Sequence, residues 1–487
     1  MTTLDQLAIK HCFKNINPAL SSEVMPSPLH KPFLVSANPL AAELIGLDES
    51  ELYTKQFVDI FSGKQLLTNS QPIAMAYSGH QFGSYNPQLG DGRGLLLGNI
   101  NTAEHGSWDL HLKGAGQTPY SRFGDGRAVL RSSIREYLGS EAIAGLGIAT
   151  TRALCIIGSD TNVQRESIEK AATLLRLAKS HIRFGHFEFF HYNNKPEIVK
   201  QLAEHVISQH YPDWKNDTDR YYKFLQQTVI NTAEMIAQWQ VAGFAHGVMN
   251  TDNMSILGDT FDYGPFGFLD DFNPAFICNH SDHQGRYAFN KQPSIGLWNL
   301  NALAHALSSL LNIDQIRQAL AQYEPYLVKR FDALMQQKLG LKQTFAGDHK
   351  LSADLLTLLQ NQRSDYHLFF RQLCSFDENQ HQHTLRDQFL DRQGFDDWAK
   401  RYRERLLAEN SDQQQRHRTM KSVNPKYVLR NYLAQQAIEA AQDHQDYSEI
   451  EQLLFVLQSP FDEHPEFEGY AKAPPEWGKH LDISCSS

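Results

Sequence analysis

The sequence has few cysteines and no long apolar run. Its five cysteines among 487 residues form no Cys-x-x-Cys pair, which excludes a disulfide-rich scaffold and a zinc site of that type. Two long uncharged stretches, 65–90 and 292–313, are interrupted by polar residues and never reach the ~20 apolar residues of a membrane span. The N-terminus has an early acid and no apolar segment of the kind found in secretory signals. We therefore expect a cytoplasmic protein with no membrane partner.

An excess of basic charge is also absent. The 45 Lys and Arg residues are outnumbered by 55 Asp and Glu residues, which gives a formal net charge of −10. A dedicated nucleic-acid binder needs a basic surface to neutralise phosphates, so this class is excluded. The length fits two or three packed units, and a composition of 41% hydrophobic and 21% charged residues is typical of a globular protein. Nothing in the sequence demands more than a monomer.

Glycine, short apolar alternations and helical periodicity are distributed unevenly, and together they predict an α+β protein. The first ~165 residues read as strands with tight turns plus one helix, whereas later residues follow helical patterns that include one long helix at 299–322. The segment at 410–417 reads as a loop. The chain divides into four predicted regions: an N-terminal extension (1–75), a small mixed, β-rich region (76–165), a larger helical region (166–335) and a helical extension with an extended tail (336–487).

Two short stretches depart strongly from the average charge. Residues 111–135 hold five basic residues and one acid, a local +4, and residues 244–273 hold five acids and no Lys or Arg, a local −5. Glycine-rich basic loops offer backbone N–H groups and cations to phosphate. Carboxylate and amide oxygens suit Mg²⁺, which prefers carboxylates together with phosphate oxygens. The sequence therefore predicts a metal–nucleotide site divided between two regions of the chain.

The basic stretch has the pattern of a strand followed by a loop and a helix. Apolar and polar residues alternate over 108–113, and Lys113 ends this predicted strand just before Gly114. A helix follows, with apolar residues recurring every four positions over 130–142, and it carries Glu136 23 residues after Lys113. This arrangement is similar to the Lys–Glu pair of protein kinases, in which the carboxylate orients a phosphate-binding lysine.

The acidic stretch has the spacing of a kinase catalytic loop. His246 precedes Asn253 by seven positions, as in the kinase motif H-R-D-x-x-x-x-N, and 262–264 reads Asp-Tyr-Gly in place of Asp-Phe-Gly. Val248 stands where the kinase catalytic aspartate belongs, and Asp252 is the nearest substitute. Each of these polar residues also has an ordinary use in turns, and only their combined spacing indicates a catalytic loop.

Several longer motifs occur between about residue 77 and residue 290. They lie at 77–83, 88–93, 112–116, 118–122, 180–185, 246–253, 262–265 and 279–282. In sequence and in order these motifs resemble those of one known family, the selenoprotein O family of kinase-fold proteins, and the chain length also suits this family.

The resemblance implies a protein-kinase-like two-lobed fold with a small β-rich N-lobe, a larger helical C-lobe and a helical C-terminal extension. It further implies transfer of AMP from ATP, or of UMP from UTP, to hydroxyl side chains of proteins, with Mg²⁺ or Mn²⁺ as cofactor. In this family the nucleotide is reversed relative to kinases, so the α-phosphate meets the acceptor. That orientation explains why a kinase aspartate is missing at Val248.

The same resemblance assigns roles to individual residues. Lys113 grips phosphate and Glu136 orients it, Asp252 accepts the proton, and Asn253 and Asp262 hold the metal. The residues expected to bind the nucleotide are Gly90, Gly92, Arg93, Lys113, Asp125, Gly126, Arg176, Arg183 and Asp262. Without the resemblance, Arg176 reads as a surface residue whose charged end reaches solvent.

The family also has a redox feature near the C-terminus, and Cys485 matches its position although Ser486 and Ser487 follow. If redox control persists in this chain, we expect a disulfide between Cys485 and Cys278. Two other functions stay open at this point: a true protein kinase, which Val248 disfavours, and an inactive ATP-binding module, which the retained Lys113 and Asp262 disfavour.

Overall fold

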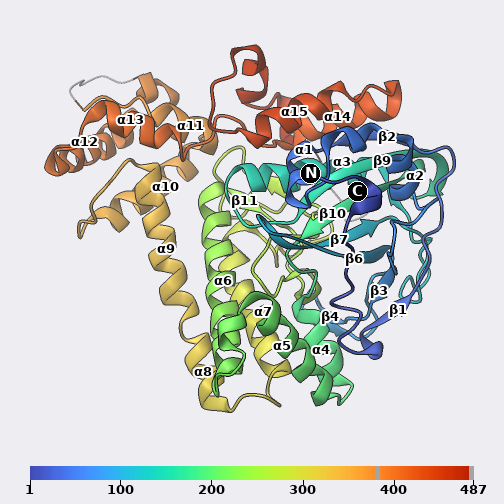
Figure 1. Cartoon of the computed structure of the whole chain (residues 1–487). Coiled ribbons are helices and arrows are strands. Elements are labelled where there is room, and N and C mark those ends of the chain that lie inside the picture. The colour runs from blue at the N-terminus through green and yellow to red at the C-terminus, as the bar shows by residue number, and fades with distance from the viewer. Residues whose placement is uncertain (379–383, 482–487) are drawn as a thin grey trace.

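The computed structural model describes residues 1–378 and 384–481 and shows an α+β protein with a sheet-rich N-terminal part and a helical C-terminal part (Figure 1). One antiparallel sheet has the strand order β1-β3-β6-β7-β10-β9-β2, and β8 pairs with β10 beside this path. Its strands are β1 (Ser21–Glu23), β2 (Phe33–Ala37), β3 (Ile73–Met75), β6 (Gly94–Thr102), β7 (Gly106–Lys113), β8 (Ala128–Val129), β9 (Arg152–Gln164) and β10 (Ile168–Ala178). The first strands of the chain, β1 and β2, occupy the two ends of this order. The sheet also extends past residue 165, because β10 lies between β7 and β9.

The predicted strand at 108–113 is confirmed as the second half of β7. Leu110 and Leu112 are buried on one face, while His111 and Lys113 share the other face because side chains alternate along a strand. The partner strand β10 places Arg176 opposite His111 and Leu174 opposite Lys113. Lys113, His111 and Arg176 therefore share one face of the sheet.

The predicted helix with a four-residue period is α3 (Leu130–Gly145), and it packs against β9 and β10. Nearly all of its residues are buried, including Ile134, Leu138 and Glu136. Two shorter helices, α1 (Pro39–Leu44) and α2 (Lys55–Phe61), were not expected from the sequence. They are only six and seven residues long, too short for a clear helical period.

A bundle of helices follows the sheet, and the predicted long helix at 299–322 is broken. α7 (Gln292–Ala306) ends before residue 307 and α8 (Ile313–Leu320) begins after it. The break is stabilised by Asn312, whose side chain accepts the backbone N–H of Gln315 while the Gln315 side chain accepts that of Asn312. The other helices of this part are α4 (Phe184–Tyr192), α5 (Pro196–His210), α6 (Arg220–Ala242) and α9 (Tyr323–Lys338).

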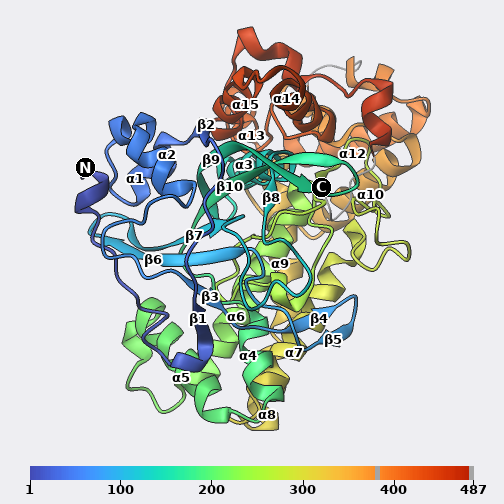
Figure 2. The same cartoon turned by 90° about the vertical axis from the view of Figure 1, so that its right-hand side faces the viewer.

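The C-terminal part consists of helices that pack partly against α3. α14 and α15 both contact α3, and they lie beside it in the two views (Figures 1 and 2). The segment at 410–417, expected to be a loop, instead begins a helix because Asp412 caps its N-terminus through the N–H of Gln415. The helices are α10 (Asp348–Gln362), α11 (Tyr366–Leu373), α12 (Arg392–Glu409), α13 (Gln413–Lys421), α14 (Asn431–His444) and α15 (Ser448–Gln458).

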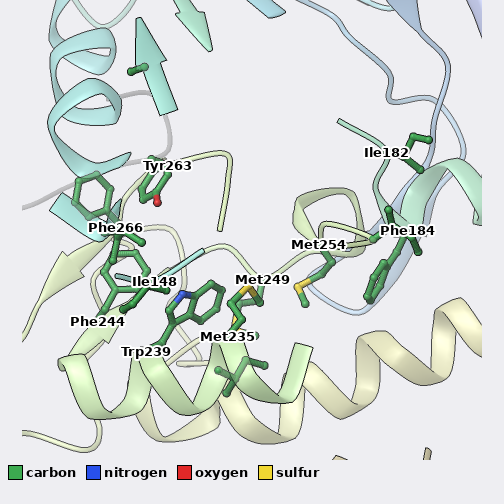
Figure 3. Packing of buried hydrophobic residues seen from close by; sticks show 14 of the residues in the cluster. Ile148, Ile182, Phe184, Met235, Trp239, Phe244, Met249, Met254, Tyr263 and Phe266 are labelled. Atoms are coloured by element: carbon green, nitrogen blue, oxygen red, sulfur yellow. The ribbon is translucent and has the colours of Figure 1, made fainter. Parts of the chain in front are cut away.

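An apolar cluster supports the loop that carries the kinase-like motif. Met249 and Met254, which flank residues 250–253, are each 1% exposed. Figure 3 shows Met249 beside Met235 and Trp239 of α6, and Met254 on the side of Phe184. Thr251–Asn253 form a single 3₁₀ turn between these two anchors. The polar residues of the loop are thus held on a rigid apolar base. No helix of residues 1–378 and 384–481 is both long and apolar enough to cross a membrane.

Candidate active site

A pocket of about 510 Å³ brings together the basic and the acidic stretches of the sequence. Its volume falls in the usual range for small-molecule sites. Seven Lys and Arg residues and four Asp residues line it, so its wall carries a net positive charge in a chain whose total charge is −10. The predicted proton acceptor Asp252 lies on this wall, whereas the predicted Glu136 lies behind it. Every residue predicted to bind nucleotide or metal also lines the pocket: Gly90, Gly92, Arg93, Lys113, Asp125, Gly126, Arg176, Arg183, Asn253 and Asp262.

Glu136 joins the two cations on the sheet face. Its carboxylate hydrogen-bonds Lys113 through Oε2, and its Oε1 lies 2.6 Å from Nε of Arg176. The Lys113, Glu136 and Arg176 side chains are 7%, 1% and 6% exposed. Burial lowers the pKa of Lys113 to about 8, although the Glu136 carboxylate raises it. The predicted Lys–Glu pair is therefore present, and Arg176 is a buried partner of the same carboxylate and not a surface residue.

Asp262 is the next residue in a series of ion pairs that begins with Lys113 and Glu136. One of its oxygens lies 2.5 Å from Nη1 of Arg176 and the other accepts a hydrogen bond from Arg183. Burial alone would raise the pKa of Asp262, but Arg183 and Arg176 outweigh it and hold that pKa well below its usual range. Asp262 adopts the left-handed backbone region, with φ of 59°, which aspartate tolerates better than most residues. The carboxylate is thus ionised and fixed between two guanidinium groups.

Asp252 has a different environment on the same pocket wall. Gln81 donates its side-chain amide to Oδ2 at 3.2 Å, whereas Oδ1 is buried and has no hydrogen-bond partner. Arg183 binds the backbone carbonyl of Asp252 at 2.7 Å and not its carboxylate. Burial raises the pKa of Asp252 to about 7. The Asp252 carboxylate therefore lines the pocket with a single side-chain hydrogen bond, and a Cβ at Gly79 would lie 2.9 Å from its buried Oδ1.

The glycine-rich loop between β7 and α3 closes the pocket on another side. Asp125 accepts the backbone N–H of Arg127 at 2.8 Å and pairs with Arg165 at 2.7 Å, so the turn after β9 holds this loop in place. Gly126 has φ of 70°, and a Cβ there would lie 2.1 Å from the carbonyl carbon of Gly116. Only glycine allows the two halves of the loop to approach this closely.

The residues expected to hold a metal ion fit a divalent cation such as Mg²⁺ or Mn²⁺. Asn253 and Asp262 present amide and carboxylate oxygens to one pocket. Asp262 gives one contact to each guanidinium, and a carboxylate has about four lone-pair sites, so sites remain for an ion. No group of three or more His, Cys, Asp or Glu side chains placed to hold a metal occurs among the described residues. This agrees with Mg²⁺ sites built from one or two carboxylates plus substrate phosphates.

Several pocket residues were missed by the sequence analysis as site residues. Asp91 and His111 lie within 3.3 Å of each other, and Tyr77, Gln81 and Arg165 line the same wall. Tyr77 and Gln81 belong to the motif at 77–83, and this membership could have marked them as candidate site residues. Arg165 had none, because only the fold brings the turn after β9 to the pocket.

The two cysteines of the predicted redox pair are not both described. Cys278 is buried outside the pocket lining, and its thiol lies 3.4 Å from the carbonyl oxygen of Ala245. Cys485 lies outside the described residues. The disulfide between them stays a prediction.

Comparison with known proteins identifies the family. A family model described as "Protein adenylyltransferase SelO" matches residues 4–458. A protein nucleotidyltransferase YdiU of Pseudomonas fluorescens is 54% identical, and those of Pseudomonas aeruginosa and Myxococcus xanthus are each 53% identical. All three alignments cover 100% of both chains. The chain therefore belongs to the SelO family of protein adenylyltransferases.

Proposed function

We propose that this protein transfers AMP from ATP to the hydroxyl groups of Ser, Thr or Tyr side chains in proteins, its own included, and releases pyrophosphate. We also propose that the sheet with α3 and the helices that follow form the two lobes of a kinase-like fold. The observation that carries the reaction is the Asp252 carboxylate, which lies on the wall of a cationic pocket and has one side-chain hydrogen bond, from Gln81. The family membership and the names of the relatives support the same activity.

The cations of the pocket are suited to bind the phosphates of the nucleotide. Arg176 and Arg183 are fixed by Asp262, and Lys113 is fixed by Glu136. Arg93 is exposed and also lines the pocket, so it is able to reach a terminal phosphate. Because charge accumulates on the leaving pyrophosphate, fixed cations beside it stabilise the transition state. The glycine-rich loop at 114–126 supplies backbone N–H groups on the remaining side.

Asp252 is suited to act as the proton acceptor. The acceptor oxygen attacks the α-phosphorus, the bond to the bridging oxygen of pyrophosphate breaks, and the hydroxyl proton moves to the Asp252 carboxylate. Gln81 donates a hydrogen bond to Oδ2 of this carboxylate, which orients it in the pocket. Asn253 and Asp262 would hold a divalent metal ion that neutralises phosphate charge.

The decisive experiment is intact-mass analysis of the purified protein after incubation with ATP and Mg²⁺ or Mn²⁺, with UTP in a parallel sample. We expect the mass of the protein to increase by that of one or more AMP groups with ATP, or UMP groups with UTP. An added phosphoryl group would instead show a protein kinase. No change, on the protein itself and on an added mixture of proteins, would show an inactive nucleotide-binding module.

Two Asp-to-Asn substitutions distinguish an effect on catalysis from an effect on folding. Asp252→Asn removes the proton acceptor and should lower AMP incorporation by about a hundredfold or more. Asp259→Asn is the matched control, since Asp259 lies seven residues later, has a buried oxygen without a partner and does not line the pocket. We expect the control to keep its activity. Equal activity in Asp252→Asn and the wild type would contradict the role of Asp252.

A further inference from the structure

Arg286 is a partly buried cation with no carboxylate partner within 4 Å among the described residues. Its guanidinium lies over the ring of Trp298 at 5.0 Å and near the ring of Tyr287 at 5.8 Å. It also packs on the turn of the β4–β5 hairpin, where a Cβ at Gly83 would come within 3.2 Å of its Cζ. Its Nε is buried and has no hydrogen-bond partner. Aromatic rings and a glycine turn thus position a guanidinium that has no ion-pair partner within 4 Å among residues 1–378 and 384–481.

The hairpin β4 (Gly79–Gln81) and β5 (Ser84–Asn86) connects this cation to the proposed proton acceptor. Gln81 donates to Asp252, and the next residue, Phe82, donates its backbone N–H to the hydroxyl of Tyr287 at 2.9 Å. That hydroxyl in turn donates to Asn250 of the catalytic loop at 2.6 Å. Gln81, which contacts Asp252, and Gly83, which lies against Arg286, are two positions apart in the chain. Two residues span at most about 7 Å, so Arg286 lies close to Asp252.

The surface around Arg286 carries no exposed acid from its own segment. Residues 273–292 contain a single acid, Asp282, which is 3% exposed and accepts the backbone N–H groups of Arg286 and Tyr287. Lys291 of the same segment is exposed. The segment that carries Arg286 therefore has a positive net charge, although the whole chain is negative.

An apolar side chain stands beside this charge. Phe82, at the tip of the hairpin, is 44% exposed, and its ring lies 5.1 Å from that of Tyr287. Exposed aromatic groups next to an arginine are typical of the residues that anchor protein partners. The combination fits a ligand segment that has both an acid and an apolar side chain.

We propose that Arg286 and Phe82 form a docking surface for the acceptor segment of a protein substrate, with an acidic residue two or three positions from the modified hydroxyl. A planar, positioned guanidinium pairs with a carboxylate through two N–H donors, and Phe82 covers a neighbouring apolar side chain. This inference rests on the proposed function, because it places the acceptor hydroxyl at Asp252.

The test uses three fluorescent peptides of the same sequence with a single serine. They differ at one position, two residues from the serine, which is Glu, Ala or Lys. Their binding to the full chain is measured by fluorescence anisotropy in the presence of a non-hydrolysable ATP analogue. We expect the Glu peptide to bind about five- to tenfold more tightly than the Ala peptide, with the difference falling at high salt. Arg286→Glu should reverse the order in favour of the Lys peptide, and Arg286→Gln should abolish the preference.

Arg317→Glu is the matched control. Arg317 is exposed on α8, and the substitution changes the charge by the same amount as Arg286→Glu. It should keep the preference of the wild type. Equal affinity for the three peptides, binding of none, or an unchanged preference in both Arg286 variants would overturn the docking surface. Since binding is measured without transfer, a chain that prefers the Glu peptide but never transfers AMP would contradict only the proposed function.

Discussion

At the scale of single residues, Glu136 links the two cations of the sheet face through one buried carboxylate. Lys113 and Arg176 both depend on it for their orientation. Replacement by glutamine keeps the shape of the side chain and removes its charge. Because the Glu136 carboxylate raises the Lys113 pKa, which burial already lowers to about 8, its loss lowers that pKa further. Lysine would then lose much of its charge near neutral pH.

We therefore predict that Glu136→Gln raises the KM for ATP about tenfold or more. Initial rates of AMP incorporation at varied ATP concentration measure this change. Glu169→Gln serves as the control, since Glu169 is an 8% exposed acid of β10 paired with Arg131 outside the pocket lining. A similar rise of KM in both variants would show a general loss of stability instead of a specific effect.

Which residues meet at the site could be predicted only in part. Lys113 and Glu136 lie on β7 and α3, two elements with clear periods, so their ion pair could be predicted from the sequence. The ion pairs of Asp262 with Arg176 and Arg183 depend instead on distant segments. No local pattern could predict these pairs.

At the scale of elements, α3 lies between the sheet and the C-terminal helices. Its last residue, Gly145, packs so closely against α15 that there is no room for a side chain. A Cβ at this position would lie 1.9 Å from the carbonyl oxygen of Leu457. Gln458 at the end of α15 donates to Glu141 of α3 at 3.3 Å and to Asn38 at 2.9 Å. The position of α3, and therefore of Glu136, depends on this contact.

We predict that Gly145→Ala destabilises the protein by about 1–3 kcal/mol through overpacking and raises the KM for ATP because α3 shifts. Thermal unfolding and initial rates measure the two effects. Gly347→Ala is the same substitution at a position where the added Cβ meets nothing within 4 Å, and it should leave both unchanged. An unaltered midpoint in Gly145→Ala would contradict the tight contact between α3 and α15.

The elements themselves were predicted best where the pattern is long. β7 and α3 follow clear periods over many residues, whereas the break at residue 307 and the start of α13 depend on single capping side chains, Asn312 and Asp412. Capping residues are also common in loops. A sequence pattern alone therefore favoured one helix at the first place and a loop at the second.

At the scale of the whole molecule, buried histidines connect stability to pH. Burial lowers the pKa of His181 to about 4, of His186 to about 3 and of His205 to about 4, against about 6.5 in an unfolded chain. Below pH 6.5 the unfolded chain binds protons that the folded chain does not. Each histidine then lowers the free energy of unfolding by up to about 1.4 kcal/mol per pH unit. Asp252 and Asp259, whose pKa values burial raises to about 7 and about 6, act in the opposite direction but are outnumbered by these three histidines.

We predict that the thermal midpoint falls as the pH is lowered from 7 to 5. His181→Gln should show a shallower dependence on pH than the wild type, because one proton-linked group is removed, even if its midpoint at pH 7 is lower. Melting curves at several pH values measure both slopes. A midpoint that rises towards pH 5, or equal slopes in the two proteins, would contradict this prediction.

The contact of Gln458 with Asn38 and Glu141 joins residues 420 and 317 positions apart in the chain. During synthesis on the ribosome, α3 and its Glu136 leave the exit tunnel long before α15 exists. The helix that orients the phosphate-binding lysine therefore gains its last support only when almost the entire polypeptide has been made. An unfinished chain would contain every residue of the pocket and still lack the contact of α15 that supports α3.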